Sequence, residues 1–212
     1  MKRTKLRLLT RAAVCTASFL GTSLAGYLHA DTTWQLPAGT PGDWFNSGNW
    51  SAGLPNSSTN ADIFDGGTAQ ITSDAATVDT LAVGNGLSET GTLDLSGGTL
   101  TAVSLQLNAG GFFNETGGTF NVDTLNNSIN ASNFNWTAGT LNVTNGSVEI
   151  DNSVNANLAA SLTLGPSQSL SAPDEIVGWY GTGTLVQSGG TNAINGGTDH
   201  GLQVGAAGGS NG

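Results

Sequence analysis

Carboxylates are the most abundant reactive groups in this chain, and few cations accompany them. All 15 Asp and Glu lie at or beyond position 31, whereas the five Lys and Arg lie within the first eleven positions. Two carboxylates at a suitable separation can hydrolyse a glycosidic bond. The only adjacent acidic pair is Asp174-Glu175. Adjacent residues of a strand point to opposite faces, so we interpret this pair as a solvated turn.

Other kinds of catalytic chemistry lack their usual groups. No Lys or Arg follows Arg11, which argues against polysaccharide lyases and phosphate-binding loops. His200 is the only imidazole after residue 30, and Cys15 is the only cysteine. A transition-metal site built from Cys and His is therefore excluded. We expect no enzyme activity and no cofactor, apart from loosely bound Ca²⁺ on oxygen ligands.

An aromatic cluster near the start of the body allows two interpretations. Trp44, Phe45 and Trp50 could stack on sugar rings, with Asp43 or Asp62 nearby as a carboxylate. The same aromatic residues could instead plug the first turn of a repeat and shield its core. We favour the plug and keep glycan stacking as the alternative.

The first thirty residues have the pattern of an export signal. Residues 1–11 are basic, residues 12–28 are mostly apolar or small, and Leu28-His29-Ala30 fits a cleavage site. We expect the mature chain to begin near Asp31, in a secreted or surface-associated location. Its acidic charge predicts no nucleic-acid partner and no attraction to anionic lipid. We also expect no membrane insertion of the mature chain.

Short alternating segments and recurring turns predict the fold. Apolar residues alternate with polar ones, as in Val103-Ser104-Leu105-Gln106-Leu107, which indicates half-buried strands. A turn recurs at offsets of 20 and 21 residues, at positions 97–100, 117–120 and 138–141. Aligning these turns places Leu93, Phe113 and Phe134 in one column, and Leu95, Glu115 and Trp136 in another.

A period near 20 residues favours an all-β, right-handed parallel β-helix, a β-solenoid of roughly eight or nine turns. A β-sandwich is the alternative, because it also uses short strands and frequent turns. We expect three segments: a signal peptide at 1–30, a Trp-rich capping segment at 31–64 and solenoid repeats at 65–212. The region 150–180 interrupts the period and predicts a longer or irregular coil.

Several motifs resemble those of a known family. The segment Asp43–Ser51 contains Gly-Asn-Trp, and Pro55 and the Asp62-Ile63-Phe64 run follow it. Glycine-rich units lie at 91–100 and 181–190. This arrangement resembles bacterial surface proteins with autotransporter-associated β-strand repeats and PEP-CTERM-type exported proteins. The resemblance implies β-coils displayed outside the cell. Because the last residues read like the middle of a repeat, we expect an N-terminal fragment.

These observations together predict a non-catalytic, exported structural or adhesive protein of the cell surface or extracellular matrix. Its partners would be extracellular polysaccharide or cell-envelope components. The alternative is a carbohydrate-binding or weakly hydrolytic β-helix module that uses Trp44, Phe45 and Trp50 to hold a polysaccharide.

Overall fold

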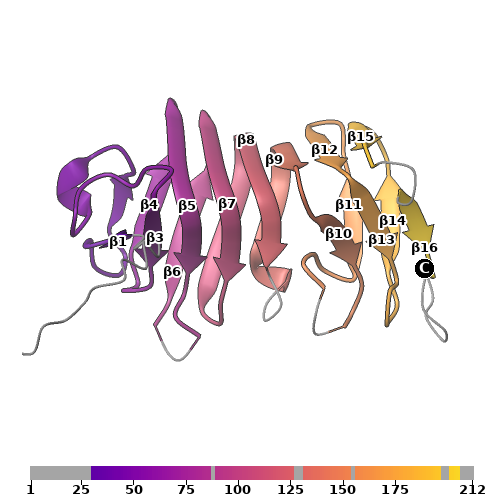
Figure 1. Ribbon diagram of the computed structural model, residues 1–212, viewed down its shortest axis with the longest axis horizontal. Helices are drawn as coiled ribbons and strands as arrows, with labels where there is room; N and C mark the ends of the chain where they lie inside the picture. The colour runs from indigo at the N-terminus through magenta and orange to yellow at the C-terminus, as the bar shows by residue number, and fades with distance from the viewer. Residues whose placement is uncertain (1–29, 87–88, 127–130, 154–155, 197–200, 206–212) are drawn as a thin grey trace, which may run out of the picture.

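The computed structural model describes residues 30–86, 89–126, 131–153, 156–196 and 201–205. These residues form an elongated stack of short strands that cross the long axis (Figure 1). Every pairing between the named strands of this part is parallel. The parallel β-solenoid is therefore confirmed, and the antiparallel layers of a sandwich are not found in it. The export signal is expected at residues 1–30, and its residues 1–29 lie outside the described residues.

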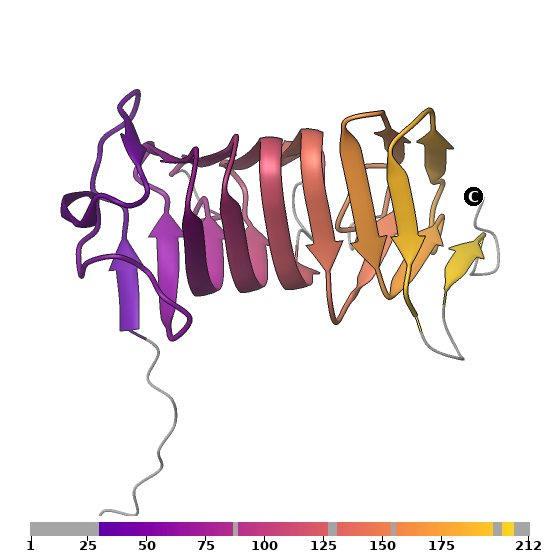
Figure 2. The same ribbon diagram turned by 90° about the horizontal axis from the view of Figure 1, so that it is seen from above.

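The chain winds around three faces, each made of stacked strands (Figure 2). The groove face contains β2 (Pro41–Asp43), β4 (Thr68–Ile71), β6 (Gly91–Leu95) and the first parts of β8 (Gly111–Asn126) and β9 (Phe134–Val143). The threonine face contains the first parts of β5 (Ala75–Val83) and β7 (Thr99–Leu107), the later parts of β8 and β9, β12 (Gln168–Ala172) and β15 (Thr191–Ile194). The rear face contains β1 (Ala30–Thr33), β3 (Thr59–Ile63) and the ends of β5, β7 and β8.

The expected side-chain columns are present in the core. Leu93 pairs with Phe113 and Phe113 with Phe134, and the rings of Phe113 and Phe134 stack with centroids 5.1 Å apart. The turns align as well, since Thr99 pairs with Thr119 and Thr119 with Thr140. Each fully buried Leu or Phe contributes roughly 1.5–3 kcal/mol, so these columns provide much of the stability.

A corner separates the threonine face from the rear face. The pairing of β7 with β5 and with β8 skips Val103, and both Val103 and Ser104 point away from the core. Two consecutive outward side chains interrupt the two-residue alternation of a straight strand. The chain therefore bends at Val103, and one strand serves two faces.

Glycine turns join the groove face to the threonine face. Gly98 and Gly118 have φ of +67° and +80°, a region that side chains other than glycine's rarely adopt. A Cβ at Gly118 would lie 2.8 Å from the carbonyl oxygen of Gly98 in the neighbouring coil. The close stacking of these turns therefore needs glycine for two independent reasons.

We expect Gly118→Ala to lower the free energy of unfolding by about 2–4 kcal/mol, the sum of left-handed strain and steric contact. Gly53→Ala is the matched control, because Gly53 has φ +87° with no atom near its Cβ position. That control should lose only about 1–2 kcal/mol. Urea denaturation measures both, and equal losses would contradict the steric contribution.

The N-terminal capping segment is continuous with the repeats. Strand β3 pairs in parallel with both β1 and β5, so the rear face runs across the boundary expected at residues 64 and 65. Residues 30–64 therefore form the first turn of the same solenoid. This segment also contains the single-turn helix η1 (Ser47–Asn49), which lies in the long connection between β2 and β3.

The period lengthens after β9, as expected for the region 150–180. Gly139 pairs with Gln168, a longer step than those of 20 and 21 residues before it. Within the described part of the chain, only the threonine face continues without interruption, through β9 and β12. Two smaller sheets begin beyond β9. One contains β11 (Ser161–Leu164) and β14 (Thr184–Gln187), and the other contains β10 (Ser147–Ile150), β13 (Asp174–Val177) and β16 (Leu202–Val204). Longer coils reduce the count to about seven turns, fewer than a uniform 20-residue period predicts.

Candidate functional site

A ladder of polar side chains crosses the groove face. Gln70 pairs with Asp94, Asp94 with Asn114 and Asn114 with Asn135. The amide nitrogen of Asn114 donates to the Asp94 carboxylate at 2.8 Å, and that of Asn135 donates to the Asn114 amide oxygen at 3.5 Å. The ladder is ordered by contacts between coils, so its polar atoms keep fixed positions relative to one another.

Local sequence explains why these residues point outward. In β6 the apolar Leu93 and Leu95 are buried, and Asp94 lies between them. The same alternation places Asn114 between the buried Phe113 and Glu115. Because β6 pairs in register with β8, and Phe113–Glu115 pair in register with β9, the outward ladder positions of successive coils lie above one another, at the roughly 4.8 Å spacing of neighbouring strands.

The ladder forms one side of a shallow groove of about 360 Å³. The other side is formed by outward residues two positions further along the chain, Ser96 and Thr116. The lining residues are Gln70, Asp94, Ser96, Asn114, Thr116 and Asn135. All six are polar and only Asp94 carries a charge, so the groove is a site for hydrogen bonding rather than for strong ion binding.

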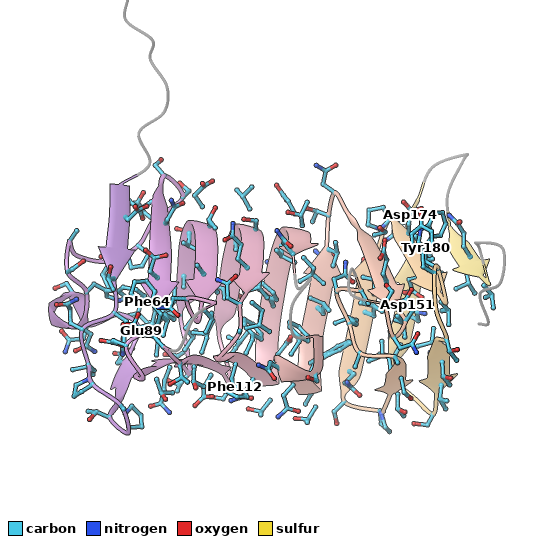
Figure 3. All side chains as sticks on the ribbon, turned by 90° about the horizontal axis from the view of Figure 1, so that it is seen from below. Phe64, Glu89, Phe112, Asp151, Asp174 and Tyr180 are labelled. Carbon is cyan, nitrogen blue, oxygen red and sulfur yellow. The ribbon has the colours of Figure 1, made fainter. Side chains whose placement is uncertain are left out.

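An exposed aromatic residue lies next to the ladder, on the side away from Ser96 and Thr116. Phe112 precedes the buried Phe113 and leaves 43% of its surface exposed. It pairs with Thr92 in the outward column next to the ladder, and it lies on the outside of the solenoid (Figure 3). Residues two apart on a strand share a face about 6.6–6.8 Å apart, so Phe112 and Asn114 are neighbours on the groove face.

The groove approaches a second hollow where the groove face is interrupted. This hollow, of about 180 Å³, lies between β9 and β11, and Asn135 lines both spaces. The side chain of Gln168 spans the interruption from inside, donating to the Trp136 carbonyl at 3.0 Å and accepting from the Gly165 amide at 2.8 Å. The exposed Ser161 and Thr163 line this hollow together with Asn135, so outward polar side chains continue along the axis beyond the ladder.

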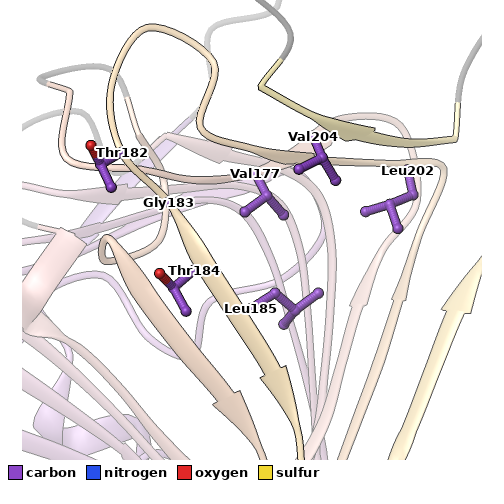
Figure 4. A pocket seen from close by; sticks show the side chains of 7 residues that line it. All are labelled: Val177, Thr182, Gly183, Thr184, Leu185, Leu202 and Val204. Atoms are coloured by element: carbon purple, nitrogen blue, oxygen red, sulfur yellow. The ribbon is translucent and has the colours of Figure 1, made fainter. Parts of the chain in front are cut away.

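Another cavity, of about 450 Å³, lies elsewhere and has a different character (Figure 4). It is lined by Val177, Thr182, Gly183, Thr184, Leu185, Leu202 and Val204. Leu202 and Val204 pair with the inward residues Glu175 and Val177, yet they are 54% and 58% exposed. This cavity is the apolar interior at the last described coil, and its wall contributes only two hydroxyls.

Glu115 is buried directly inside the groove face. It is 0% exposed, and neither carboxylate oxygen has a hydrogen-bond partner. Burial raises the pKa of Glu115 to about 9, so the group is neutral at pH 7. Aligning the repeated turns within the sequence places Glu115 in a column with Leu95 and Trp136. An acidic residue in an otherwise apolar column is the sequence feature that could have indicated a buried carboxyl group here.

The aromatic residues expected to stack on sugars are mostly inside the protein. Trp44 and Trp50 are 1% and 4% exposed, and Trp34 is fully buried. Trp50 packs edge-on against both other indoles, with centroids 5.0 and 4.8 Å apart, and its Nε1 donates to the Trp44 carbonyl at 2.8 Å. These geometries agree with a plug of the first turn, and they argue against glycan stacking on Trp44 or Trp50. Phe45 is half-buried and packs against the same core.

The carboxylates expected near this cluster do not converge. Asp43 lies on the groove face, where it pairs with Gln70, and its carboxylate accepts from the Phe45 amide. Asp62 lies on β3 of the rear face. Burial, with a smaller contribution from Asp31, raises the pKa of Asp62. The two acids belong to different faces and form no catalytic pair.

The adjacent acids Asp174 and Glu175 form no such pair either. Glu175 is buried, and its carboxylate accepts from the Asn192 amide at 2.9 Å. Burial raises its pKa, although the Asn192 hydrogen bond partly opposes the shift. Asp174 is half-buried and accepts from the Gly201 amide. The two carboxylates differ in burial and in hydrogen-bond partner, and the expected solvated turn is wrong for Glu175. His200 lies outside the described residues.

Asp151 is a structural carboxylate that the sequence did not indicate. It accepts from the backbone amides of Ser153, Trp179 and Tyr180 at 2.6–3.2 Å. Burial acts to raise the pKa of Asp151, but the hydrogen bonds from Ser153, Tyr180 and Trp179 outweigh it and lower the pKa. The carboxylate fixes the turn that carries Trp179 and the exposed Tyr180.

Across the described residues, no group of three or more His, Cys, Asp or Glu side chains lies close enough to hold a metal ion. Within that same part of the chain, no helix is long and apolar enough to cross a membrane. Comparison with protein-family models, curated proteins and solved structures yields no match to this chain.

Proposed function

We propose that this protein is an exported, non-catalytic β-solenoid that serves as a structural or adhesive component of a bacterial cell surface or extracellular matrix. The basic n-region, the apolar stretch and the small-residue cleavage site support export. Surface display is supported by the resemblance to autotransporter-associated repeat proteins and PEP-CTERM-type proteins.

The observation that carries this proposal is the continuity of polar ladders over a stack of parallel coils. The threonine face repeats Thr99, Thr119 and Thr140 in register, and the groove face repeats its amides in the same way. A hydrogen-bonded stack of this kind is stiff along its axis and repeats one chemical surface many times. Repetition suits multivalent attachment, in which weak contacts add along the rod.

The arrangement of the carboxylates favours a non-catalytic role. Glycoside hydrolysis needs two carboxyl groups about 5–9.5 Å apart and facing one sugar. The acidic neighbours in the sequence do not form such a pair, because Glu175 is buried while Asp174 is half-buried, and Asp43 and Asp62 lie on different faces.

Export is tested by expressing the full chain in a Gram-negative host and separating cytoplasm, envelope and medium. We expect the protein outside the cytoplasm with a mature N-terminus near Asp31, and we expect intact cells to bind an antibody against it. Replacing the five basic residues of positions 1–11 by Gln should leave it in the cytoplasm with Met1 retained. Exchanging Lys2 and Lys5 for Arg keeps the charge and should preserve export.

Wild-type protein that stays in the cytoplasm with its N-terminal segment intact would overturn the proposed location.

Adhesion is tested separately, with beads coated with the secreted chain and settled on biofilm or cell-envelope material. We expect retention above that of albumin-coated beads. The alternative function, a carbohydrate-binding or weakly hydrolytic module, is favoured by one observation, namely the polar ladder beside Phe112.

A further inference from the structure

We propose that the groove face binds a linear, uncharged polysaccharide that lies along the solenoid axis, with Phe112 stacking on one sugar ring and the Asp94–Asn114–Asn135 ladder hydrogen-bonding its hydroxyls. This inference rests on the proposed function, because it names the polysaccharide class through which an exported rod would attach. It uses residues different from the tryptophans that the sequence indicated.

The dimensions of the groove fit an extended polymer. The ladder runs over four successive coils from Gln70 to Asn135, which is about 14 Å at the strand spacing. The hollow between β9 and β11 extends the polar path beyond Asn135. An open groove that follows the axis accepts a chain of sugar units, whereas a compact ligand would leave most of these groups unused.

The chemistry of the wall matches sugar hydroxyls. A hydroxyl group both donates and accepts, and an amide side chain does the same through its NH₂ group and its carbonyl oxygen. Asn114 and Asn135 each use one amide hydrogen within the ladder, so a second hydrogen on each nitrogen can reach a ligand. Because the ladder already fixes these side chains, little conformational entropy is lost when a glycan binds.

Phe112 provides the apolar component that such a site needs. Its exposed ring is a flat apolar surface beside a polar ladder. The C–H face of a pyranose ring is apolar, and burying it against an aromatic ring removes both surfaces from water. A cluster of polar groups alone would compete poorly with water for hydroxyls, so this stacking is expected to provide much of the affinity.

Charge decides which class of glycan fits. The groove contains one carboxylate, on Asp94, and no Lys or Arg follows Arg11 anywhere in the sequence. Uronate-rich or sulfated chains would be repelled by the acidic body without a cation to neutralise them. One carboxylate among amides and hydroxyls is also too little to hold a polycation. The groove therefore suits a neutral polysaccharide.

The test is affinity electrophoresis and calorimetry of the secreted full chain against soluble neutral polysaccharides: a mixed-linkage β-glucan, xylan, galactomannan and an α-glucan. Alginate and chitosan serve as anionic and cationic comparisons. We expect saturable binding to at least one neutral polysaccharide that is insensitive to salt. Phe112→Ala should weaken it at least about tenfold, and Asn114→Ala should weaken it less.

Tyr180→Ala is the matched control, because Tyr180 is an exposed aromatic on a distant turn. It should leave binding unchanged, and circular dichroism should show that all three variants keep the fold. Failure of every neutral polysaccharide to bind, unchanged binding by Phe112→Ala, or salt-sensitive binding to alginate or chitosan alone would each overturn the proposal. If the chain is exported and retained at the surface but binds no polysaccharide, glycan binding at the groove face is rejected and the proposed function stands. If the chain binds glycans but stays in the cytoplasm, the proposed function is rejected and glycan binding stands.

Discussion

Replacing Glu115 by leucine is expected to increase the free energy of unfolding at pH 7 by about 3 kcal/mol or more. Burial raises the pKa of Glu115 from 4.5 to about 9 in the folded protein. Between these values the unfolded chain releases a proton that the folded protein keeps, so stability falls as pH rises. At about 1.4 kcal/mol per pH unit, this loss reaches roughly 3 kcal/mol at pH 7 and 6 kcal/mol at pH 9.

Urea denaturation at pH 4.5, 7 and 9 measures this effect. We expect wild-type stability to decline over that range and the decline to be much smaller in Glu115→Leu. Burial also raises the pKa of Glu149 and Glu175, so some decline remains. Glu115→Gln keeps the size and removes the titration, which separates charge from packing.

Parallel pH profiles for Glu115→Leu and the wild type would show that Glu115 is not the neutral buried acid described above.

Phe113→Ala is expected to lower the free energy of unfolding by about 3–5 kcal/mol, as observed for large aromatic truncations in protein cores. Phe113 is fully buried, and its ring contacts Phe120 in its own coil and Phe134 in the next, with centroids 4.8 and 5.1 Å apart. Its removal leaves a cavity that spans two coils, which the hydrogen-bonded backbone cannot close.

The adjacent Phe112→Ala is the matched control for this truncation. The two side chains are identical in chemistry and point to opposite sides of β8. Phe112→Ala should change stability by no more than about 0.5 kcal/mol, as thermal and urea denaturation can show. Similar losses for both variants would contradict the register of β8, and the same measurement shows whether Phe112→Ala is a clean probe of glycan binding.

The repeats made the fold predictable, because short-range alternation and an in-phase turn together specify which residues face the core. The column of Leu93, Phe113 and Phe134 followed from the spacing of three Gly-Thr turns, and the structure places these residues in one register. The number of turns was overestimated, since the distance between paired residues grows where loops such as the one holding η1 are inserted. Loop length leaves no periodic signal in a sequence.

The candidate site was harder to predict than the fold. The sequence allowed two interpretations of Trp44 and Trp50, a plug of the first turn and a glycan-stacking surface, and their packing with Trp34 agrees with the favoured plug. Their burial depends on ring contacts between residues that directly follow β1, β2 and η1, which local patterning does not reveal. The amide ladder was present in the sequence as Asp94, Asn114 and Asn135 at the same phase, yet only the coil register shows that these residues hydrogen-bond to one another.

The interruption after β9 has a mechanical consequence. In stacked repeats the stability is the sum of each repeat and its contacts with its neighbours, and here the backbone ladder linking the two halves is reduced to β9 with β12. This seam is therefore expected to yield first under tension along the rod. The C-terminal coils should separate first while the coils from β1 to β9 stay folded, so a stretched molecule would lengthen in two steps and absorb a sudden load before it detaches.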